Sequence, residues 1–559
     1  MKNNRTFMKK VYNSYQIHYL VILLVVFLLS VEGYSQISQG GEPYSFSKQI
    51  DLPEFQQPNP TELQFRENDL TKDCSAMEFA KFLSLESSLQ DPAWQIIQAD
   101  DKSTIYRLAI SSPGALAIGA YFSDFHIPIG AELFIYSPDH QQKIGAFTSL
   151  NNPSSGYFAT EYLLGDELII EYREPVGVHG KGHFVVKEIL HAYRGFDQQE
   201  NEKGFGGSGD CEVNVNCPEG DGKKNQRDAV LRLLIKNGNS GVWCTGSLVN
   251  NTSEDRTPYV ITADHCGNQS SSSDQEQWVI YFHYQAWGCA NPAGEPTHKT
   301  MVGCTEVASS SNAGILGSDF FLVQLLQDVP ENYNPYFLGW NRDGLGSSNG
   351  YSIHHPQGDI KKVSTYTDAL ENASYSSGIP NGFWEVVWSE TTSGHGVTEP
   401  GSSGSPIFDS EGYLVGTLTG GQESCSALTA PDYYGKFSKH WDQNGASDDE
   451  QLLPWLDPIN SGIEKMSGIY LGIDEAEVLS NKLFEAVPNP VLNELTLYFH
   501  KNYNDYQVLI CDLSGQVIDD FISHGNISKT LSVSHLQKGV YIIHVRSGNL
   551  HQTIKLAKL

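Results

Sequence analysis

The chain has 559 residues and a net charge of −30, from 36 Lys and Arg against 66 Asp and Glu. This length suggests about three domains, and 39% hydrophobic with 11% aromatic residues indicates folded rather than disordered domains. The excess of acid argues against a general binder of nucleic acid or anionic lipid, because both need a surface rich in Lys and Arg.

The N-terminus has the composition of an export signal. Four basic residues precede the apolar run 20–31, which is too short to span a bilayer comfortably. The small residues Gly33 and Ser35 occupy the positions that a signal peptidase reads before Gln36. We therefore predict a signal peptide over residues 1–35, with an uncleaved N-terminal anchor as the alternative.

Residues 36–203 are expected to form a β-rich domain. Short apolar runs separated by turn signals occupy residues 94–195, and a glycine-rich seam follows at 203–209. The bond between Lys203 and Gly204 lies in this seam. We hypothesise that the domain is a propeptide, removed by cleavage after Lys203.

Residues 204–470 show the same strand-like spacing with few helical patterns, which favours an all-β barrel or sandwich. This segment carries 32 acidic and 13 basic residues, so the acidity of the chain concentrates here. Residues 471–483 are typical of a polar linker, and residues 484–559 predict a small β-sandwich.

Three short segments of the middle part hold residues suited to acyl transfer by serine. His265 follows an apolar run, Asp319 opens another, and Ser403 lies in a glycine-flanked loop. A serine nucleophile needs a base to take its proton, an acid to orient that base, and backbone amides to bind the oxyanion. We predict a triad of His265, Asp319 and Ser403, with the amides of Gly401 and Ser403 as the oxyanion hole.

Each segment alone has a plainer interpretation: a flexible loop, a structural histidine, a strand cap. Their order, His then Asp then Ser, is that of chymotrypsin-like barrels. It differs from the order in α/β-hydrolases, whose G-x-S-x-G motif fails here at Ser405. The combination in an exported β-rich segment favours a protease. An inactive, surface-displayed binding protein is the alternative from another functional class.

Further motifs carry a resemblance to a known family. They are Cys211 with Cys217-Pro218-Glu219-Gly220-Asp221-Gly222, Cys244-Thr245-Gly246-Ser247-Leu248-Val249-Asn250-Asn251, His354-His355-Pro356-Gln357-Gly358-Asp359 and Gly401–Pro406. With these, most of residues 206–440 resembles the lysyl endopeptidase family of secreted bacterial serine proteases. The resemblance implies a chymotrypsin-like double six-stranded antiparallel β-barrel with the active site between the barrels. His265, Asp319 and Ser403 match the family triad residue by residue.

Nine cysteines are present, seven of them between positions 211 and 425, and export favours disulfides over a metal site. Sequence alone does not give their pairing. The resemblance leaves Cys304 without a partner, and the states of Cys74 and Cys511 stay open. The pairs that it implies are Cys211–Cys425, Cys217–Cys289 and Cys244–Cys266.

The expected specificity residue differs from that of trypsin-type enzymes, whose acid stands where this chain has Val397. The resemblance implies instead that Asp432 binds the substrate's cation, with Glu399 as a second acid near it. A turn residue and a surface acid are the plainer interpretations. A fixed carboxylate in a closed site favours the compact ammonium of lysine over the wide guanidinium of arginine. Thr419 replaces a histidine of the family, and a protease that also accepts arginine is the alternative.

No metal or cofactor is expected. His354 and His355 are adjacent and would point to opposite faces of a strand, so they cannot easily chelate one ion. Ser402 stands where trypsin-type zymogens use an Asp to capture a new N-terminal ammonium, so that route of activation is absent. The expected partners are proteins or peptides with lysine at the cleaved position, and the enzyme is expected to be a monomer.

The tail 484–559 carries motifs of its own. They are Pro488-Asn489-Pro490, Asp512-Leu513-Ser514-Gly515, Leu536-Gln537-Lys538-Gly539-Val540-Tyr541 and a terminal Lys555–Lys558. These resemble the C-terminal sorting domain of the type IX secretion system. The resemblance implies passage through the outer membrane by that machinery, then release or surface attachment. A small adhesive or carbohydrate-binding β-sandwich is the alternative.

Overall fold

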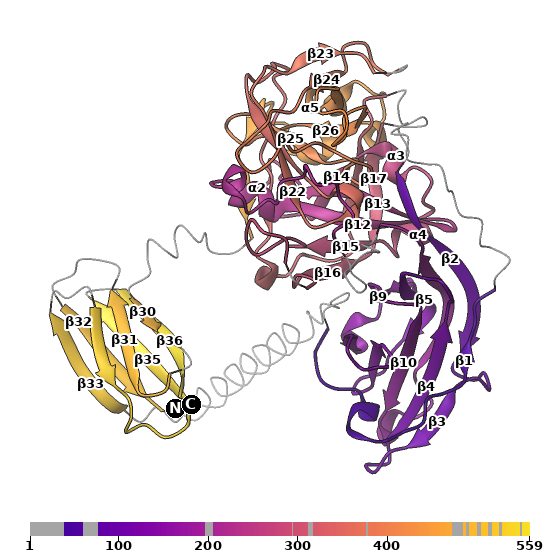
Figure 1. The fold of residues 1–559 in the computed structure, drawn as a ribbon, viewed down its shortest axis with the longest axis vertical. Coiled ribbons are helices and arrows are strands. Elements are labelled where there is room, and N and C mark those ends of the chain that lie inside the picture. Colours follow the sequence, from indigo (N-terminus) through magenta and orange to yellow (C-terminus); the bar gives the residue numbers. More distant parts are fainter. Residues whose placement is uncertain are drawn as a thin grey trace, which may run out of the picture. The chain divides into compact units, whose positions relative to one another are not determined.

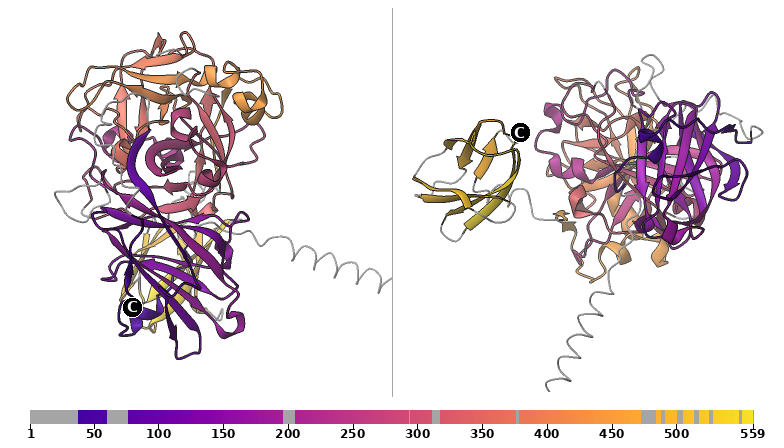
Figure 2. Two further views of the ribbon diagram at one scale, coloured as in Figure 1. Left: turned by 90° about the vertical axis from the view of Figure 1, so that its right-hand side faces the viewer. Right: turned by 90° about the horizontal axis from the view of Figure 1, so that it is seen from below.

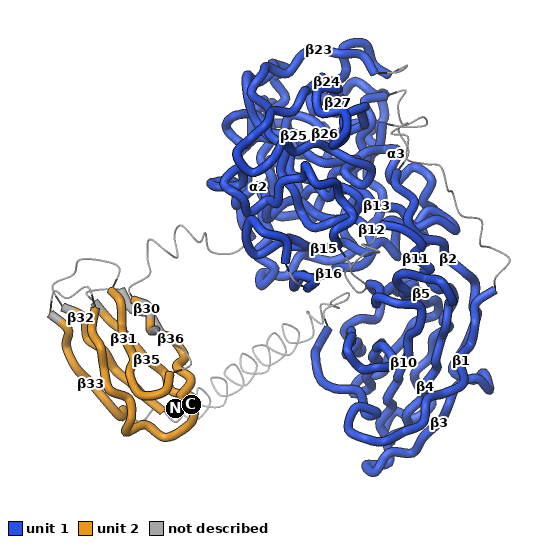
Figure 3. The backbone as a smooth tube through the Cα atoms, in the orientation of Figure 1, with its two compact units in different colours: residues 1–471 blue, residues 472–559 orange. Residues whose placement is uncertain are grey.

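In the computed structural model the chain divides into two compact units, residues 1–471 and residues 472–559 (Figure 3). The predicted signal peptide with Ser35 and Gln36, the Lys203–Gly204 bond, Cys74 and most of the predicted linker lie outside the described residues. The described ranges are 38–59, 76–195, 205–292, 294–310, 317–375, 378–471, 484–487, 491–499, 505–512, 517–524, 528–547 and 550–558.

The N-terminal part of the first unit is built from two packed groups of strands (Figure 1). One sheet has the order β1-β4-β10-β6-β7, with β3 against β4. Its Leu108, Leu133 and Ile170 share a buried cluster with Phe122 and Ile189 of the other group. The elements are η1 (Tyr44–Ser47), β1 (Phe55–Gln56), β2 (Met77–Ser88), β3 (Gln95–Gln98), β4 (Thr104–Ser111), β5 (Ala117–His126), β6 (Glu132–Tyr136), β7 (Lys143–Phe147), η3 (Ser149–Asn151), β8 (Phe158–Ala159), β9 (Leu163–Leu164), β10 (Glu167–Glu174), η4 (Val176–Val178) and β11 (His183–Ala192).

The strand β2 joins this N-terminal part to the rest of the unit. It pairs antiparallel with β11 on one side and with β13 (Ser240–Leu248) on the other, so one 12-stranded sheet runs through both parts (Figure 2). Phe79 of β2 stacks on Trp243 of β13 with ring centroids 4.2 Å apart. The boundary expected near residue 203 therefore falls inside one compact unit.

Residues 205–471 hold two further strand groups. The first contains η5 (Pro218–Gly220), α2 (Lys224–Ala229), β12 (Val230–Asn237), β13, β14 (Tyr259–Thr262), α3 (Asp264–Gly267), α4 (Ser272–Gln275), β15 (Val279–Phe282), β16 (Lys299–Val302), β17 (Cys304–Ser309) and β18 (Phe321–Leu325). The second contains η7 (Glu331–Tyr333), β19 (Tyr336–Phe337), β20 (Trp340–Asn341), β21 (Gly350–His354), η8 (Pro356–Gly358), β22 (Lys362–Tyr366), β23 (Glu371–Ala373), β24 (Phe383–Val386), β25 (Pro406–Phe408), β26 (Leu414–Gly421), β27 (Asp432–Lys436), α5 (Phe437–Asp442), η9 (Asp448–Glu450), α6 (Leu453–Leu456), β28 (Lys465–Met466) and β29 (Ile469–Tyr470).

The prediction of an all-β fold is confirmed. In the second group, β19 and β29 form a separate 2-stranded sheet. The other strands form a 9-stranded sheet of order β22-β21-β25-β26-β27-β24-β23, in which β20 pairs with β26 and β28 pairs with β20. The strand counts, 12 and 9, exceed the expected six. Five N-terminal strands extend the first sheet, to which residues 205–471 contribute the seven strands β12 to β18, and short strands extend the second sheet.

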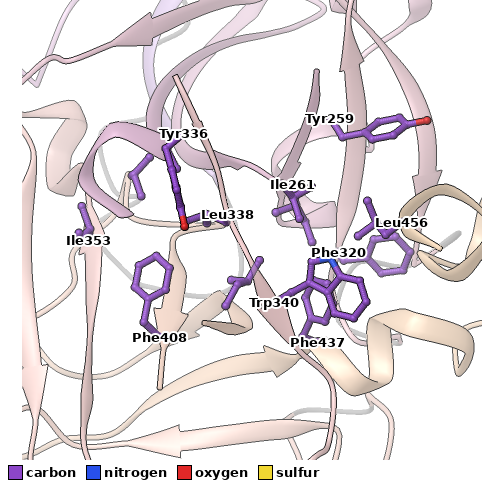
Figure 4. Packing of buried hydrophobic residues seen from close by; sticks show 14 of the residues in the cluster. Tyr259, Ile261, Phe320, Tyr336, Leu338, Trp340, Ile353, Phe408, Phe437 and Leu456 are labelled. Carbon is purple, nitrogen blue, oxygen red and sulfur yellow. The ribbon is translucent and has the colours of Figure 1, made fainter. Parts of the chain in front are cut away.

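A buried hydrophobic cluster joins the two strand groups (Figure 4). Ile261 of β14 and Phe320 come from the first group, while Trp340, Phe408 and Phe437 come from the second. Full burial of an Ile or Phe side chain stabilises the folded state by roughly 1.5–3 kcal/mol. The three segments that hold the predicted triad are thus anchored in one shared core.

The second unit is a small β-sandwich. Its sheets have the orders β30-β31-β34 and β33-β32-β35-β36, and Leu495, Val508 and Ile543 share one buried core. The strands are β30 (Phe484–Val487), β31 (Glu494–Phe499), β32 (Asp505–Cys511), β33 (Val517–His524), β34 (Ser528–Ser532), β35 (Gly539–Ser547) and β36 (Leu550–Lys558). In neither unit do the described residues include a helix long and apolar enough to cross a membrane.

Candidate active site

Two neighbouring strands bring His265 and Asp319 together. β14 pairs antiparallel with β18, so that Thr262 lies opposite Phe321. His265 lies in α3 just beyond the end of β14, and Asp319 lies just before β18. The imidazole Nδ1 and the carboxylate Oδ2 are 2.9 Å apart, and the His265 amide donates to Oδ1 at 3.1 Å. The carboxylate therefore fixes both the ring and the backbone of His265.

Asp319 itself is held in an unusual conformation. Its side chain is fully buried, and its φ of 62° lies in the left-handed region. For a residue other than glycine this conformation costs on the order of 1–3 kcal/mol, and it persists only where the surrounding structure imposes it. Such strained residues cluster at functional sites.

The environment of His265 makes it a stronger base than a free histidine. Burial by itself would lower its pKa, but the charge of Asp319 and their hydrogen bond outweigh burial, so the pKa is raised above 6.5. Among the described residues, Nε2 of the same ring has no hydrogen-bond partner. That nitrogen is available to take a proton.

Ser403 lies in a loop that is fastened to β13. Its carbonyl accepts a hydrogen bond from the Thr245 amide at 2.8 Å, and Thr245 Oγ1 donates to the carbonyl of Gly401 at 3.0 Å. Gly401 and Gly404 have φ values of 99° and 79°, which favour glycine. A Cβ on Gly404 would lie 2.1 Å from Thr262 Oγ1. Gly404 is therefore required for the loop to approach the end of β14, while a Cβ on Gly401 would lie 2.8 Å from the backbone nitrogen of Gly358.

A disulfide holds the serine loop and the histidine side by side. Cys244–Cys266 joins β13 to α3, and Cys266 Sγ lies 3.9 Å from the carbonyl oxygen of Ser403. This contact places the backbone of Ser403 beside Cys266, the residue that follows His265. Closing the 22-residue loop stabilises the fold by about 3 kcal/mol in the chain-entropy model.

The other cysteines follow the expected pattern in the described part of the chain. Cys211–Cys425 and Cys217–Cys289 are also disulfides, while Cys304 and Cys511 are buried, unpaired thiols. Within the same described residues, no three His, Cys, Asp or Glu side chains gather as a metal site requires.

The residues proposed for the oxyanion hole are braced by a buried histidine. Among the described residues, the amides of Gly401 and Ser403 donate no hydrogen bond. Between them, Ser402 Oγ lies 2.8 Å from His354 Nδ1, and His354 Nε2 lies 2.9 Å from Ser364 Oγ. In the sequence, His354 belongs to one motif of the family resemblance and is a metal-ligand candidate disfavoured by its neighbour His355. The structure gives it a different contact, one that holds the residue next to Ser403.

His440 of α5 is a second buried histidine that sequence analysis missed. Its Nδ1 lies 2.7 Å from Ser318 Oγ, and its Nε2 lies 3.0 Å from Thr417 Oγ1 of β26. Burial lowers its pKa to about 3 although Asp319 opposes the shift, so the ring is neutral. It ties the segment of Asp319 to the second strand group. No local pattern marks it, because a single histidine on a helix is usually structural.

The two acids expected at the specificity site have different surroundings. Glu399 Oε2 accepts a hydrogen bond from the Gly209 amide at 3.1 Å, so this acid contacts the segment before Cys211. Asp432 is fully buried at the start of β27, where its Oδ2 accepts from Trp388 Nε1 at 2.8 Å. Of the two, Asp432 is the carboxylate enclosed by the second sheet.

Two parts of the chain match models of known families. Residues 205–435 match the family model of the lysyl endopeptidase C-terminal domain, and residues 485–558 match the secretion system C-terminal sorting domain. A lysyl endopeptidase of Pseudomonas aeruginosa is 25% identical over 313 residues, which cover 54% of this chain and 64% of that protein. The match thus spans just under two thirds of the relative's length. With its sorting domain, the chain is a secreted or cell-surface protein.

Solved protease structures give more distant likenesses. The protease Anisep from Arthrobacter nicotinovorans is 17% identical and covers 38% of this chain and 91% of its own, with a TM-score of 0.27. The serine endoprotease from Yersinia pestis is 9% identical and covers 61% of this chain and 96% of its own, with a TM-score of 0.26. Likenesses at this level carry no argument about the site.

Proposed function

We propose that this chain, whose residues 205–435 form a domain of the lysyl endopeptidase family, is a secreted serine endopeptidase that cleaves peptide bonds on the carboxyl side of lysine. The observation that carries the proposal is the Asp319–His265 contact beside the Ser403 loop. Nδ1 of the imidazole faces the carboxylate at 2.9 Å, and Nε2 is left for the nucleophile. Strand pairing, a disulfide and a shared core together support this arrangement.

The proposed mechanism assigns one step to each group. Ser403 Oγ attacks the scissile carbonyl while His265 Nε2 takes the hydroxyl proton. The carbonyl oxygen becomes an oxyanion, which the amides of Gly401 and Ser403 stabilise. His265 then gives the proton to the leaving amine, which departs and leaves an acyl-enzyme. Water, deprotonated by the same ring, hydrolyses the ester and restores Ser403.

Asp319 supports both proton transfers without leaving the carboxylate form. Its hydrogen bond keeps the proton of neutral His265 on Nδ1, so Nε2 is the acceptor. Its charge stabilises the imidazolium that forms when Ser403 is deprotonated.

Specificity for lysine is assigned to Asp432. Its buried carboxylate lies in β27, which pairs with β26 of the same sheet, and β26 follows β25, the strand that leads out of the Ser403 loop. A carboxylate buried in this way is stabilised by an ammonium group that enters with the substrate. We further propose that the enzyme acts as a monomer.

We also propose that residues 36–203 are a propeptide cleaved after Lys203. The link between this segment and the protease part includes the β2–β13 pairing and the Phe79–Trp243 stack. Beyond the cleavage point, the Gly206 amide donates to Asp359 Oδ1 at 2.7 Å. That bond belongs wholly to the protease part and survives cleavage. N-terminal sequencing of secreted enzyme should begin at Gly204, and a start between residues 37 and 190 would contradict this assignment.

A peptide-library digest read by mass spectrometry tests activity and specificity together. Wild-type enzyme should cleave after lysine, whereas S403A, which folds around the same core, should give no cleavage. Cleavage after arginine as well would favour the broader trypsin-like alternative. No cleavage by wild type, together with no labelling of Ser403 by an organophosphonate, would favour an inactive binding protein.

A further inference from the structure

A second buried carboxyl group lies beside Asp432. Glu423 follows β26 and is 0% exposed, as is Asp432. The hydroxyl of Thr398 contacts both, with Oγ1 at 2.9 Å from Glu423 Oε1 and 2.7 Å from Asp432 Oδ2. A Cβ on Gly421 would lie 2.0 Å from Asp432 Oδ1 and 2.6 Å from Glu423 Oε2. The other oxygens of the two groups therefore converge on the backbone of Gly421.

The hydrogen bonds around Thr398 require a proton on one of the two acids. A threonine hydroxyl carries a single hydrogen and can donate only once, so one of its two carboxyl contacts must be the donor. Asp432 Oδ2 already accepts from Trp388 Nε1 at 2.8 Å, which favours its ionised form. Glu423 is then the protonated member: it donates to Thr398 Oγ1, and Thr398 donates to Asp432.

Repulsion between like charges also favours one shared proton on Glu423 and Asp432. Two carboxylates that share a buried site cannot both ionise at low cost, because their like charges repel in a medium of low dielectric. Tyr433 and Tyr434 of β27 are titratable groups beside Asp432. Both tyrosines have raised pKa values, caused by burial and by negative charge that includes Asp432, so they are neutral. Neither tyrosine supplies a positive charge to the pair.

We propose that Glu423 is a second specificity-determining residue, which binds the substrate's lysine ammonium together with Asp432. This inference rests on the proposed function, which assigns Asp432 to lysine binding. In the free enzyme the pair holds one proton. When the ammonium enters, Glu423 releases that proton to solvent and gives up its hydrogen bond to Thr398 Oγ1, which still donates to Asp432. Both carboxylates then face the three N–H donors of the cation. Lysine binding is therefore coupled to release of one proton.

The probe is n-butylamine, a four-carbon primary amine that reproduces the end of a lysine side chain. Its binding to the processed enzyme is measured by calorimetry in buffers of different ionisation enthalpy at slightly acidic pH, which counts the protons exchanged. Wild type should release about one proton for each amine bound. This count tests the proposal without any variant.

The variant E423Q removes the exchangeable proton while its amide NH₂ can still donate to Thr398. It should release no proton, and its Kd for n-butylamine should rise roughly ten- to a hundredfold, as for loss of a hydrogen bond to a charged group. The matched control is E411Q, because Glu411 is an exposed acid paired with Lys465 at 2.6 Å. It should match wild type in both quantities.

The measurements distinguish a wrong role for Glu423 from a wrong assignment of the lysine site to Asp432. Amine binding by wild type without proton release, or unchanged release by E423Q, overturns the role of Glu423. If D432N binds the amine and cleaves after lysine like wild type, the proposed lysine site itself is wrong. If D432N loses amine binding while E423Q behaves like wild type, Asp432 binds the ammonium and Glu423 does not.

Discussion

The sites around Asp319 and Asp432 both contain a fully buried carboxylate, yet they differ in what faces the charge. Asp319 contacts the imidazole of His265 and its amide, so its charge is used inside the protein. Asp432 contacts the neutral donors Trp388 and Thr398, neither of which carries a positive charge. A buried charge beside neutral donors is more costly than one beside a cation. The first site is therefore complete without substrate, whereas the second is expected to gain its cation from the substrate.

The largest effect is expected from D319N. The amide would favour the wrong tautomer of His265 and could not stabilise the imidazolium, so kcat should fall about ten-thousandfold while KM changes little. Steady-state kinetics on a lysine peptide measures both constants. The matched control is D264N, since Asp264 also raises the pKa of His265 but the Nδ1 contact belongs to Asp319. An effect of D264N as large as that of D319N would contradict the assigned role.

The next effect concerns the second site. D432N should lower kcat/KM for lysine peptides about a hundred- to a thousandfold, because the ammonium would be buried without its full countercharge. Hydrolysis of p-nitrophenyl acetate, which has no cation to bind, should remain near the wild-type rate. Equal losses on both substrates would show that the substitution had damaged the triad rather than specificity.

More of the site around Asp319 than of the site around Asp432 can be predicted from the sequence. The strand before His265 and the strand after Asp319 are both visible as apolar runs, and their pairing is the simple antiparallel kind. No local sequence pattern predicts the place of Glu423. Its position beside Asp432 depends on the register between β26 and β27, which shifts between Leu418 and Gly420. A one-residue shift of this kind changes which side chains share a face and cannot be predicted from local pattern.

The joint between β2 and β13 was missed for a related physical reason. Strands pair through backbone groups, which every sequence supplies, so the choice of partner strand is set by the tertiary fold. Phe79 and Trp243 stack across this joint, but an apolar strand residue predicts burial without naming its partner. His354 and His440 likewise owe their roles to contacts with Ser402 and Ser318 that are distant in sequence.

The smallest expected effect is a difference in pH dependence between substrates that use both sites and substrates that use only the site of His265. Neutral His265 is the base, so kcat/KM should fall tenfold per pH unit below its pKa, which is raised above 6.5. With p-nitrophenyl acetate this is the only pH-dependent decrease in rate that we expect. D319N should move that decrease to lower pH, because the charge of Asp319 that raises the pKa of His265 is gone. A lysine peptide must also displace the proton of Glu423, so its profile should steepen toward a hundredfold per unit where both groups are protonated. E423Q should return that slope to tenfold while leaving the acetate profile unchanged. Identical wild-type pH profiles for the two substrates would mean that cleavage of both depends on the protonation of His265 alone.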